Sequence, residues 1–373
     1  MSSLEKLNDI KNALNNKFIE REKEVEAMLI ALLSRQHMLM IGPAGTAKSA
    51  LSAELSNIIE GSEYFQWLLT KFSTPEEIFG ALSLKDLENG VYKRNTTSKM
   101  PEAHIVFLDE IFKANSAILN SLLTLINERL FYNNGQPTTS PLMSVIGSSN
   151  EFPEEGEGLE ALFDRFLLRF EVDYIGDNDN FIAMLKGKGQ DQKMPHMTLQ
   201  ELESLQFLCD MVMIPDKVYD VLSDIRTDLK DEGIRPSDRR FKQSLSILRA
   251  KSLIEQRQEV ETKDLLLLEN TLWETPEQKS MVSTIVHNHA LDFVARTIKT
   301  INEEANEFLS LVEDDSSNTD NILEVNQKLK SLIQELNDLK TKNPTRQEID
   351  KTIKQIKEKQ EKITEVVLNP INS

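Results

Sequence analysis

The sequence predicts an α/β domain built on a parallel sheet, followed by regions that contain only helices. Short apolar runs alternate with helical patterns over residues 1–175, an order typical of parallel sheets. Polar residues follow directly after these apolar runs, at the sheet edge where such folds place their binding crevice. After Asp173 the helical patterns continue to the C-terminus. We therefore expect an α/β core at 1–175, an all-α domain at 176–275 and a helical bundle at 276–373.

Composition narrows the classes of function. The chain has 373 residues, with 43 basic and 61 acidic side chains and a net charge of −18. A chain this acidic is a poor candidate for binding nucleic acid over a wide face. The single cysteine, Cys209, excludes an internal disulfide framework and is expected to be buried. No apolar run approaches the ~20 residues that span a bilayer, and no signal-peptide pattern begins the chain, so we expect a cytoplasmic protein.

The first half of the chain carries the strand signals. Helical spacing of apolar residues predicts a helix over 3–33, interrupted at Phe18 and Ile19. Apolar runs predict buried strands at 37–41 and 105–108, each followed by a helix, the first to about residue 60 and the second over 116–129. The pair Asn134-Gly135 predicts a type I′ turn that joins 130–132 to 142–146 as a hairpin.

The second half is predicted to be helical. Residues 187–193 form a polar, glycine-containing connector, and short helices follow over 198–273. One longer helix is expected over 276–312. Beyond it, apolar residues at alternating steps of three and four predict two heptad helices, separated at Asn343-Pro344. The heptad positions are Ile322, Val325, Leu329, Leu332, Leu336 and Leu339, then Ile349, Ile353, Ile356, Gln360, Ile363 and Val367. Two such segments joined by a short turn predict an antiparallel hairpin, whose stripes form a core or, alternatively, an arm for a partner.

A glycine-containing loop separates the first predicted strand from its helix, which is the context of a phosphate-binding P-loop. Backbone N–H groups and the helix N-terminus would surround the phosphates. Lys48 would reach the β- and γ-phosphates, and the Ser49 hydroxyl would bind Mg²⁺. The residues assigned to nucleotide binding in this loop are Gly42, Pro43, Ala44, Gly45, Thr46, Ala47, Lys48, Ser49 and Ala50.

One loop position departs from the GxxxxGK[ST] pattern. Ala47 stands where the second glycine belongs. A methyl group is small, and we expect this residue to sit in helical geometry, so that the loop tolerates the alanine.

The second predicted strand ends in two carboxylates, Asp109 and Glu110. Adjacent residues of a strand point to opposite sides, which allows two separate roles. Asp109 would hold Mg²⁺ through water, and Glu110 would take the proton of the attacking water. The alternative for Asp109 is a helix cap. The base-selecting motif Asn-Lys-x-Asp of ordinary GTPases is absent, so ATP with Mg²⁺ is the expected ligand.

With Lys48, Asp109, Glu110 and Asn150 in this order, the chain resembles the AAA+ ATPases of the MoxR group, and within it the RavA branch. The resemblance covers about 15–275. The segments that carry it are Gly-Pro-Ala-Gly-Thr-Ala-Lys-Ser at 42–49, Lys-Phe-Ser-Thr-Pro-Glu-Glu-Ile-Phe-Gly at 71–80, Pro-Glu-Ala-His-Ile-Val-Phe-Leu-Asp-Glu-Ile at 101–111, Ile-Leu-Asn-Ser-Leu-Leu-Thr-Leu-Ile-Asn-Glu-Arg at 118–129, Ser-Asn-Glu-Phe-Pro at 149–153 and Leu-Glu-Ala-Leu-Phe-Asp-Arg-Phe at 159–166.

The resemblance implies further site residues. Asn150 matches sensor 1, which orients the attacking water beside Glu110. Arg165 matches the arginine finger that acts on a neighbouring subunit's ATP, with Arg169 as the alternative. Arg239 matches sensor 2, which reaches the γ-phosphate from the lid domain, with Arg240 as the alternative. The pair Phe18 and Ile19 resembles the segment that contacts adenine.

The resemblance also implies surfaces for a client protein. Residues 80–99 and the hairpin at 134–135 occupy the places of two family insertions that lie toward a central pore. In that arrangement Tyr92, Lys93, Arg94 and Tyr132 face a client; the alternative is ordinary solvated hairpin tips. The RavA branch carries a β-rich module in its C-terminal helical domain, and this sequence shows helix signals there instead.

The implied function is an ATP-hydrolysing motor that forms a homo-oligomeric ring, expected to be a hexamer, and remodels or activates partner proteins. Relatives of this type commonly pair with a protein that bears a von Willebrand factor A domain. Two alternatives remain: a nucleotide-gated scaffold with little turnover, and a nucleic-acid motor.

Overall fold

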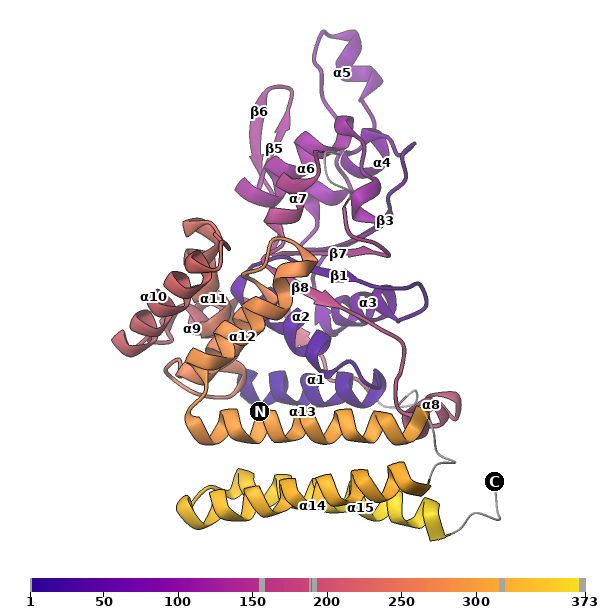
Figure 1. The fold of residues 1–373 in the computed structure, drawn as a ribbon. Helices are drawn as coiled ribbons and strands as arrows, with labels where there is room; N and C mark the ends of the chain where they lie inside the picture. The colour runs from indigo at the N-terminus through magenta and orange to yellow at the C-terminus, as the bar shows by residue number, and fades with distance from the viewer. Residues whose placement is uncertain (1, 154–157, 188, 190–192, 315–318, 369–373) are drawn as a thin grey trace. The chain divides into compact units, whose positions relative to one another are not determined.

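The computed structural model describes residues 2–153, 158–187, 189, 193–314 and 319–368. The chain divides into two compact units, Met1–Val286 and His287–Ser373, and Figure 1 labels most of their helices and strands. Both expected classes of structure are present, a parallel sheet with surrounding helices and a helical C-terminus, so the predicted fold class is confirmed.

The first unit contains a five-stranded parallel sheet with the order β3-β4-β7-β1-β8. Its strands are β1 (Met38–Ile41), β3 (Tyr64–Leu68), β4 (Ile105–Asp109), β7 (Ser144–Ser149) and β8 (Leu168–Glu171). The strands β1 and β7 are buried along their whole length, because helices cover both faces of a parallel sheet. Helix α2 (Glu22–Ser34) packs against β1, β7 and β8, and helix α3 (Lys48–Ile58) packs against β4 and β7.

Shorter elements surround this sheet. The helices are α1 (Ser3–Lys17), α4 (Pro75–Phe79), α5 (Leu84–Glu88), η1 (Met100–Glu102), η2 (Ile111–Lys113), α6 (Ser116–Glu128), α7 (Glu160–Arg165) and α8 (Asn178–Leu185). Two small sheets join β2 (Ile59–Glu60) to β9 (Met197–Thr198) and β5 (Leu130–Asn133) to β6 (Gln136–Thr139). Sequence reasoning had not assigned β3 or β8; in β8, charged Arg169 and Glu171 interrupt the apolar pattern.

The hairpin prediction needs a correction. The Asn134-Gly135 turn is present, with both residues at positive φ, but β5 pairs with β6 and not with 142–146. Every residue of β6 is exposed, so hydrophobic patterning could not reveal it. The run at 142–146 instead leads into β7, between β4 and β1 of the main sheet.

The all-α region of the first unit packs on the N-terminal helices. Its elements are α9 (Leu199–Met211), α10 (Asp216–Asp231), α11 (Asp238–Ile254), η3 (Thr262–Asn270) and η4 (Pro276–Gln278). Helix α9 contacts α1, α2 and α11, and α11 contacts α2 and η3. Cys209 is buried in α9, which raises the pKa of its thiol to about 12. Part of the polar connector at 187–193 lies outside the described residues.

The single helix expected over 276–312 is two helices, α12 (Lys279–Ala290) and α13 (Phe293–Asp314). The break falls at Asp292, whose carboxylate accepts a hydrogen bond from the Ala295 N–H at 2.9 Å. An aspartate that caps the next helix ends the preceding one, and this overrides the continuous apolar pattern.

Helices α13, α14 (Thr319–Lys342) and α15 (Gln347–Leu368) form the predicted bundle. The heptad residues described in α14, and Ile349, Ile353 and Ile356 of α15, are buried in one cluster with Val294, Ile301 and Ala305 of α13. Gln360 is half-buried, while the side chains of Ile363 and Val367 lie outside those described. None of the helices described is both long and apolar enough to cross a membrane.

Candidate nucleotide site

The phosphate-binding loop lies at the carboxyl edge of the sheet, between β1 and α3. The Gly42 N–H donates to the carbonyl oxygen of Ser149 at the end of β7, at 3.0 Å. A Cβ atom at Gly42 would come within 1.9 Å of the Val172 carbonyl oxygen. The loop therefore requires glycine at position 42, because the backbone at Val172, directly after β8, packs against it.

Ala47 contradicts the helical geometry expected for it. Its backbone is in the left-handed region, with φ 66° and ψ 16°. This conformation costs an alanine about 1–2 kcal/mol, because its Cβ approaches the next carbonyl oxygen. The glycine of the usual motif avoids that cost. This loop therefore has the left-handed turn of the motif, with alanine in place of glycine.

Lys48 begins α3, and its ammonium group is held within the loop. Its Nζ donates to the carbonyl oxygens of Gly42 at 2.6 Å and Pro43 at 2.8 Å. Burial lowers the pKa of this ammonium, while the charges of Asp109 and Glu110 act in the opposite direction. A desolvated cation at a helix N-terminus, beside an exposed loop backbone, is a donor set that fits nucleotide phosphates.

Asp109 ends β4, next to β7, and Glu110 follows it directly. The Ser148 hydroxyl donates to Asp109, and the Glu110 N–H donates to the same carboxylate at 3.1 Å. Glu110 does not continue the strand as expected: its φ of 53° turns the chain into η2. A left-handed turn, and not strand alternation, therefore separates the two carboxylates.

The structure brings Asn150 to Glu110. The Asn150 side-chain amide donates to the Glu110 carboxylate at 2.5 Å, across 40 residues of sequence. Lys113 lies on the other side of that carboxylate, with its Nζ 3.4 Å from the second oxygen. A carboxylate with an amide directed at it, next to a P-loop and Asp109, can accept a proton from water and orient it.

A cavity of about 340 Å³ adjoins the P-loop. Phe18 and Ile19 line it, as expected for a base-binding segment. Gly45, Thr46 and Ala47 of the predicted loop line it as well. Sequence reasoning missed the four lining residues beyond β8, because that segment carries no motif. The lining residues are Lys17, Phe18, Ile19, Arg21, Gly45, Thr46, Ala47, Tyr174, Ile175, Phe181 and Met184. A mostly apolar cavity beside a phosphate loop suits a planar base.

Two side chains, those of Arg21 and Glu20, hold the walls of this cavity together. The buried Arg21 donates from Nε to the Thr46 carbonyl oxygen at 3.2 Å and from Nη2 to the Asp173 carbonyl oxygen. The Glu20 carboxylate accepts from the N–H groups of Gly176 and Asp177 at 2.8 and 3.1 Å, and from the Asn180 amide at 2.9 Å. These hydrogen bonds lower the pKa of Glu20.

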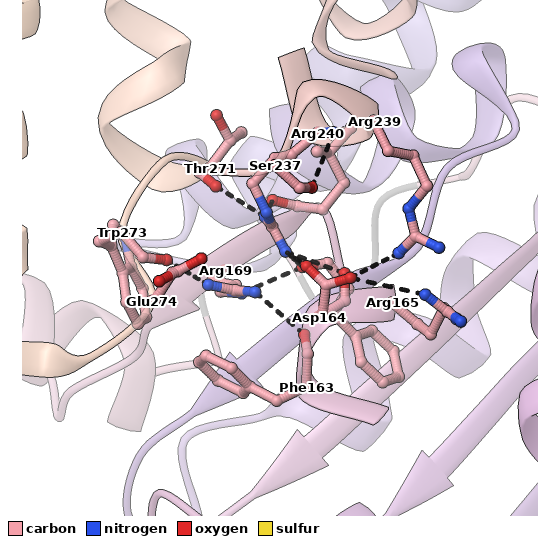
Figure 2. Close-up of polar contacts among 12 residues, drawn as sticks. Phe163, Asp164, Arg165, Arg169, Ser237, Arg239, Arg240, Thr271, Trp273 and Glu274 are labelled. Carbon is pink, nitrogen blue, oxygen red and sulfur yellow. Dashed lines mark hydrogen bonds and ion pairs between the residues drawn. The ribbon is translucent and has the colours of Figure 1, made fainter. Parts of the chain in front are cut away.

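A second site gathers the candidate arginines around one carboxylate, Asp164 of α7 (Figure 2). Arg239 lies 2.6 Å and Arg165 lies 3.5 Å from the same carboxylate oxygen, Oδ2. Arg240 lies 3.2 Å from the other oxygen, Oδ1. The predicted finger and the predicted sensor 2 therefore meet in one cluster, although 74 residues separate them in the sequence.

The two alternative arginines are buried. Arg169 is 1% exposed and donates to the carbonyl oxygens of Phe166, Phe163 and Trp273, with its guanidinium 3.9 Å from the centre of the Phe163 ring. Arg240 is 2% exposed and donates to the carbonyl oxygens of Leu167 and Thr271. Both therefore join the lid-side segments to the core, whereas Arg165 and Arg239 keep exposed surface.

The segment 80–99 and the β5–β6 hairpin lie at the same end of the first unit (Figure 1) and are joined by hydrogen bonds. The Tyr92 N–H donates to the Asn134 side-chain oxygen at 3.0 Å, and the Arg94 N–H donates to that of Asn133 at 2.8 Å. Tyr92 and Tyr132 are each 55% exposed. The Arg94 guanidinium instead pairs with Glu76 at 2.9 Å and is 16% exposed, so it offers less surface than the tyrosines.

Comparison with known proteins places these features in a family. Residues 5–210 match the family described as the MoxR domain in the MoxR-vWA-beta-propeller ternary systems, and residues 217–286 match an AAA lid domain. Two uncharacterized proteins of Methanocaldococcus jannaschii are similar to this chain. One is 37% identical over 284 residues, which cover 76% of this chain and 74% of that protein. The other is 35% identical over 312 residues, which cover 83% of each protein. The chaperone MoxR1 of Mycobacterium tuberculosis is 30% identical over 162 residues, 42% of this chain and 41% of that protein.

A solved structure has the same fold. The structure of a proposed ATPase from Cytophaga hutchinsonii aligns with a TM-score of 0.62 at 15% identity, and covers 76% of this chain and 94% of that one. The family match spans more than half of the chain and includes both the P-loop and the Asp109-Glu110 pair. The chain belongs to the MoxR family of AAA+ ATPases.

Proposed function

We propose that the protein hydrolyses ATP with Mg²⁺ and uses the cycle to remodel or activate a partner protein. The hydrogen bond from Asn150 to Glu110 is the observation that supports turnover most directly. It joins the predicted sensor to the predicted base at the sheet edge that carries the P-loop. A protein that only bound nucleotide would not require that pairing.

In this mechanism the phosphates lie against the loop backbone, and Lys48 moves its hydrogen bonds from the Gly42 and Pro43 carbonyls to the phosphate oxygens. Ser49 and Asp109 would hold Mg²⁺, which neutralises phosphate charge when bound. Glu110 accepts a proton from the attacking water, and Asn150 holds the Glu110 carboxylate in place. Phe18 and Ile19 contact the base.

The catalytic arginines come from a neighbouring subunit in this proposal. Arg165 stabilises the charge that develops on the γ-phosphate, and Arg239 contacts the same phosphate as sensor 2. Their common contact with Asp164 supports their acting at one site, and therefore at the neighbour's ATP. Because one chain cannot complete its own site, we propose a closed homo-oligomer, a ring of six subunits.

The proposal also covers organisation, partners and location. The functional divisions are a core at 1–175, a lid at 176–275 and a helical bundle at 276–373. The matched family is described through MoxR-vWA-beta-propeller systems, which supports a partner with a von Willebrand factor A domain. The RavA branch stays a prediction from the motif segments. Because ATP is made and kept inside cells, we propose a cytoplasmic location.

The test is the specific ATPase rate measured against protein concentration, with Mg²⁺ and no partner. We expect the rate per subunit to rise with concentration and then level, because sites form between subunits. Lys48→Ala should lose nucleotide binding, whereas Glu110→Gln should keep binding and lose turnover. Tight ATP binding without turnover in the unaltered chain, with or without a vWA-domain protein, would contradict the proposal and favour a scaffold.

A further inference from the structure

The arginine cluster contains more positive than negative charge. Four guanidinium groups, those of Arg165, Arg169, Arg239 and Arg240, lie around the carboxylate of Asp164 (Figure 2). Besides Asp164, the carboxylate of Glu274 also raises the pKa values of the two buried arginines. The Asp164 carboxylate pairs directly with three of the four guanidinium groups, those of Arg165, Arg239 and Arg240.

The four arginines do not depend on Asp164 equally. Arg169 and Arg240 are anchored on backbone carbonyl oxygens and are buried. The side chains of Arg165 and Arg239 are 23% and 36% exposed. Within the described residues, the Nε atom of Arg165 is buried without a hydrogen-bond partner, and Arg239 has one further contact, to the Asn127 side chain at 3.4 Å. Asp164 is thus the principal group that orients the two exposed cations.

The two exposed cations come from different parts of the first unit. Arg165 ends α7 of the core, whereas Arg239 lies in the first turn of α11 in the lid. Both approach the same oxygen of Asp164, and Arg240 holds the second oxygen from a buried position. Burial and the neighbouring charge of Arg239 both lower the pKa of Arg165, so the two cations repel each other where they stand.

We propose that Asp164 is a positioning residue that holds Arg165 and Arg239 together, so that core and lid present both guanidinium groups to the same phosphate. This inference rests on the proposed ATPase function. Without the carboxylate the two like charges separate, and Arg239 is no longer held beside Arg165. A misplacement of about 1 Å in a catalytic group can cost about 100-fold in rate. The P-loop and base cavity of the same chain are unchanged, so ATP binding is kept.

The test compares Asp164→Asn with Asp164→Glu in the full chain. We expect Asp164→Asn to lower kcat by about 100-fold while the KM for ATP changes by less than about 2-fold. Asp164→Glu keeps the charge and should recover part of kcat. The control is Asp238→Asn, on the same helix as Arg239: Asp238 is 86% exposed, pairs with Arg226 at 3.1 Å, and should leave kcat unchanged.

A double-mutant cycle separates positioning from a general structural role. In an Arg239→Ala background, Asp164→Asn should cost much less than in the unaltered protein, because the pair it holds is already broken. An equal cost in both backgrounds, or an unchanged or raised kcat in Asp164→Asn, would overturn the inference. If thermal unfolding shows that Asp164→Asn does not fold, Asp164→Glu is the deciding variant. It should lower kcat and leave ATP binding intact. A kcat equal to that of the unaltered chain would overturn the inference.

The outcome for the unaltered chain distinguishes the two proposals. If it hydrolyses ATP and Arg165→Ala abolishes turnover, a normal rate in Asp164→Asn removes this inference alone. If the unaltered chain shows no turnover in any mixture with a partner, the proposed function fails and the inference fails with it.

Discussion

At Ala47 a single methyl group meets a backbone turn that glycine fits better. The residue lies at φ 66° because the chain must turn its N–H groups inward before α3 begins. Two other turning points near the site, Glu20 and Glu110, also have positive φ without glycine. The backbone around the nucleotide site is therefore more constrained than its residue types suggest.

Replacing Ala47 by glycine should relieve this constraint. We expect Ala47→Gly to raise the free energy of unfolding by between zero and about 1 kcal/mol. The relief of left-handed strain should outweigh the greater freedom of glycine in the unfolded chain. Thermal unfolding measures this. Ala53→Gly, in the interior of α3, is the matched control and should destabilise by about 1 kcal/mol. A loss of the same size at Ala47 would show that the turn carries no strain.

Some residues of the candidate site could be predicted from the sequence, and others could not. Lys48 and Glu110 could be selected because each belongs to a local motif that follows a strand, and Asn150 because the family resemblance implies its role. Asp164 could not, since its importance comes from contacts with Arg239 and Arg240, and those depend on how the lid packs on the core. An aspartate beside an arginine carries no such signal in sequence.

Among the elements, α1, α2, α11 and η3 are joined by a chain of ion pairs. Glu26 lies 2.5 Å from Lys11 and 2.7 Å from Lys251, and Lys251 lies 2.9 Å from Glu255. Arg257 continues the chain from Glu255 at 2.9 Å to the buried Asp264. Networks of this kind hold helices in one arrangement more effectively than isolated surface pairs.

This network predicts a loss of stability in acid. Burial raises the pKa of Glu255, but its bonds to Lys251 and Arg257 outweigh burial and lower it from 4.5 to about 2. A carboxylate with a lowered pKa stabilises the fold above its unfolded pKa and loses that contribution as the pH falls through its folded pKa. Part of the unfolding free energy should therefore disappear between about pH 4.5 and 2.

Glu255→Gln should be less stable than the unaltered protein at pH 7 and should lose less stability over that acid interval. Urea unfolding at a series of pH values measures both effects. Glu232→Gln, at an exposed position at the end of α10, is the control and should follow the unaltered protein. Parallel pH dependences for Glu255→Gln and the unaltered chain would contradict the assignment.

The C-terminal helices are held together by their heptad stripes. Leu329 and Leu336 of α14 and Ile349 of α15 are each 0% exposed, so the stripes form a core within this unit. Because these side chains are buried against one another, they are not available as an arm that binds a partner. The charged residues on the opposite faces form mostly exposed pairs, which contribute little.

Leu336→Ala should destabilise the C-terminal bundle by about 2–5 kcal/mol, because it removes a fully buried side chain and leaves a cavity. Urea unfolding followed by far-ultraviolet circular dichroism should show an earlier loss of part of the helical signal. Gln334→Ala, exposed on the same helix, should shift that transition by less than about 0.5 kcal/mol. Equal shifts for the two variants would mean that Leu336 is not packed.

At the scale of the whole molecule, the candidate nucleotide site and the arginine cluster are two separate constellations of one chain. The first is built from β1, β4 and β7, and the second from α7, β8 and α11. If both act on one ATP, as we propose, two chains must meet, and activity is then a property of the assembly.

Mixing variants tests this sharing of sites. Arg165→Ala and Glu110→Gln should each be inactive alone, because each lacks one half of every site. Mixed rings should regain part of the rate, since an Arg165→Ala subunit next to a Glu110→Gln subunit has an intact Glu110 and receives an intact Arg165. The measurement is the ATPase rate against mixing ratio. No recovery where mixed rings form would rule out Arg165 as the finger supplied by the neighbour.

Local patterns in the sequence were sufficient to predict the fold class, the buried strands β1 and β4, the heptad bundle, and the loops that follow strand ends. These features depend on local periodicity and on residue types at short spacing, and such patterns are visible within a single segment of the sequence. Edge and polar strands escaped detection: β6 is wholly exposed and β8 contains the buried Arg169. The break at Asp292 was also missed, because a cap interrupts a helix without interrupting its apolar pattern.

Contacts between distant side chains, by contrast, became visible only in the folded chain. It brings the Glu20 carboxylate to 176–180, Asn150 to Glu110, and Asp164 to Arg239. Such contacts depend on the packing of the whole unit, because a side chain's partners are set by where separate elements cross and not by its neighbours in sequence. For that reason the candidate catalytic groups could be named from motifs, while the carboxylate that holds two of them together became visible only in the folded chain.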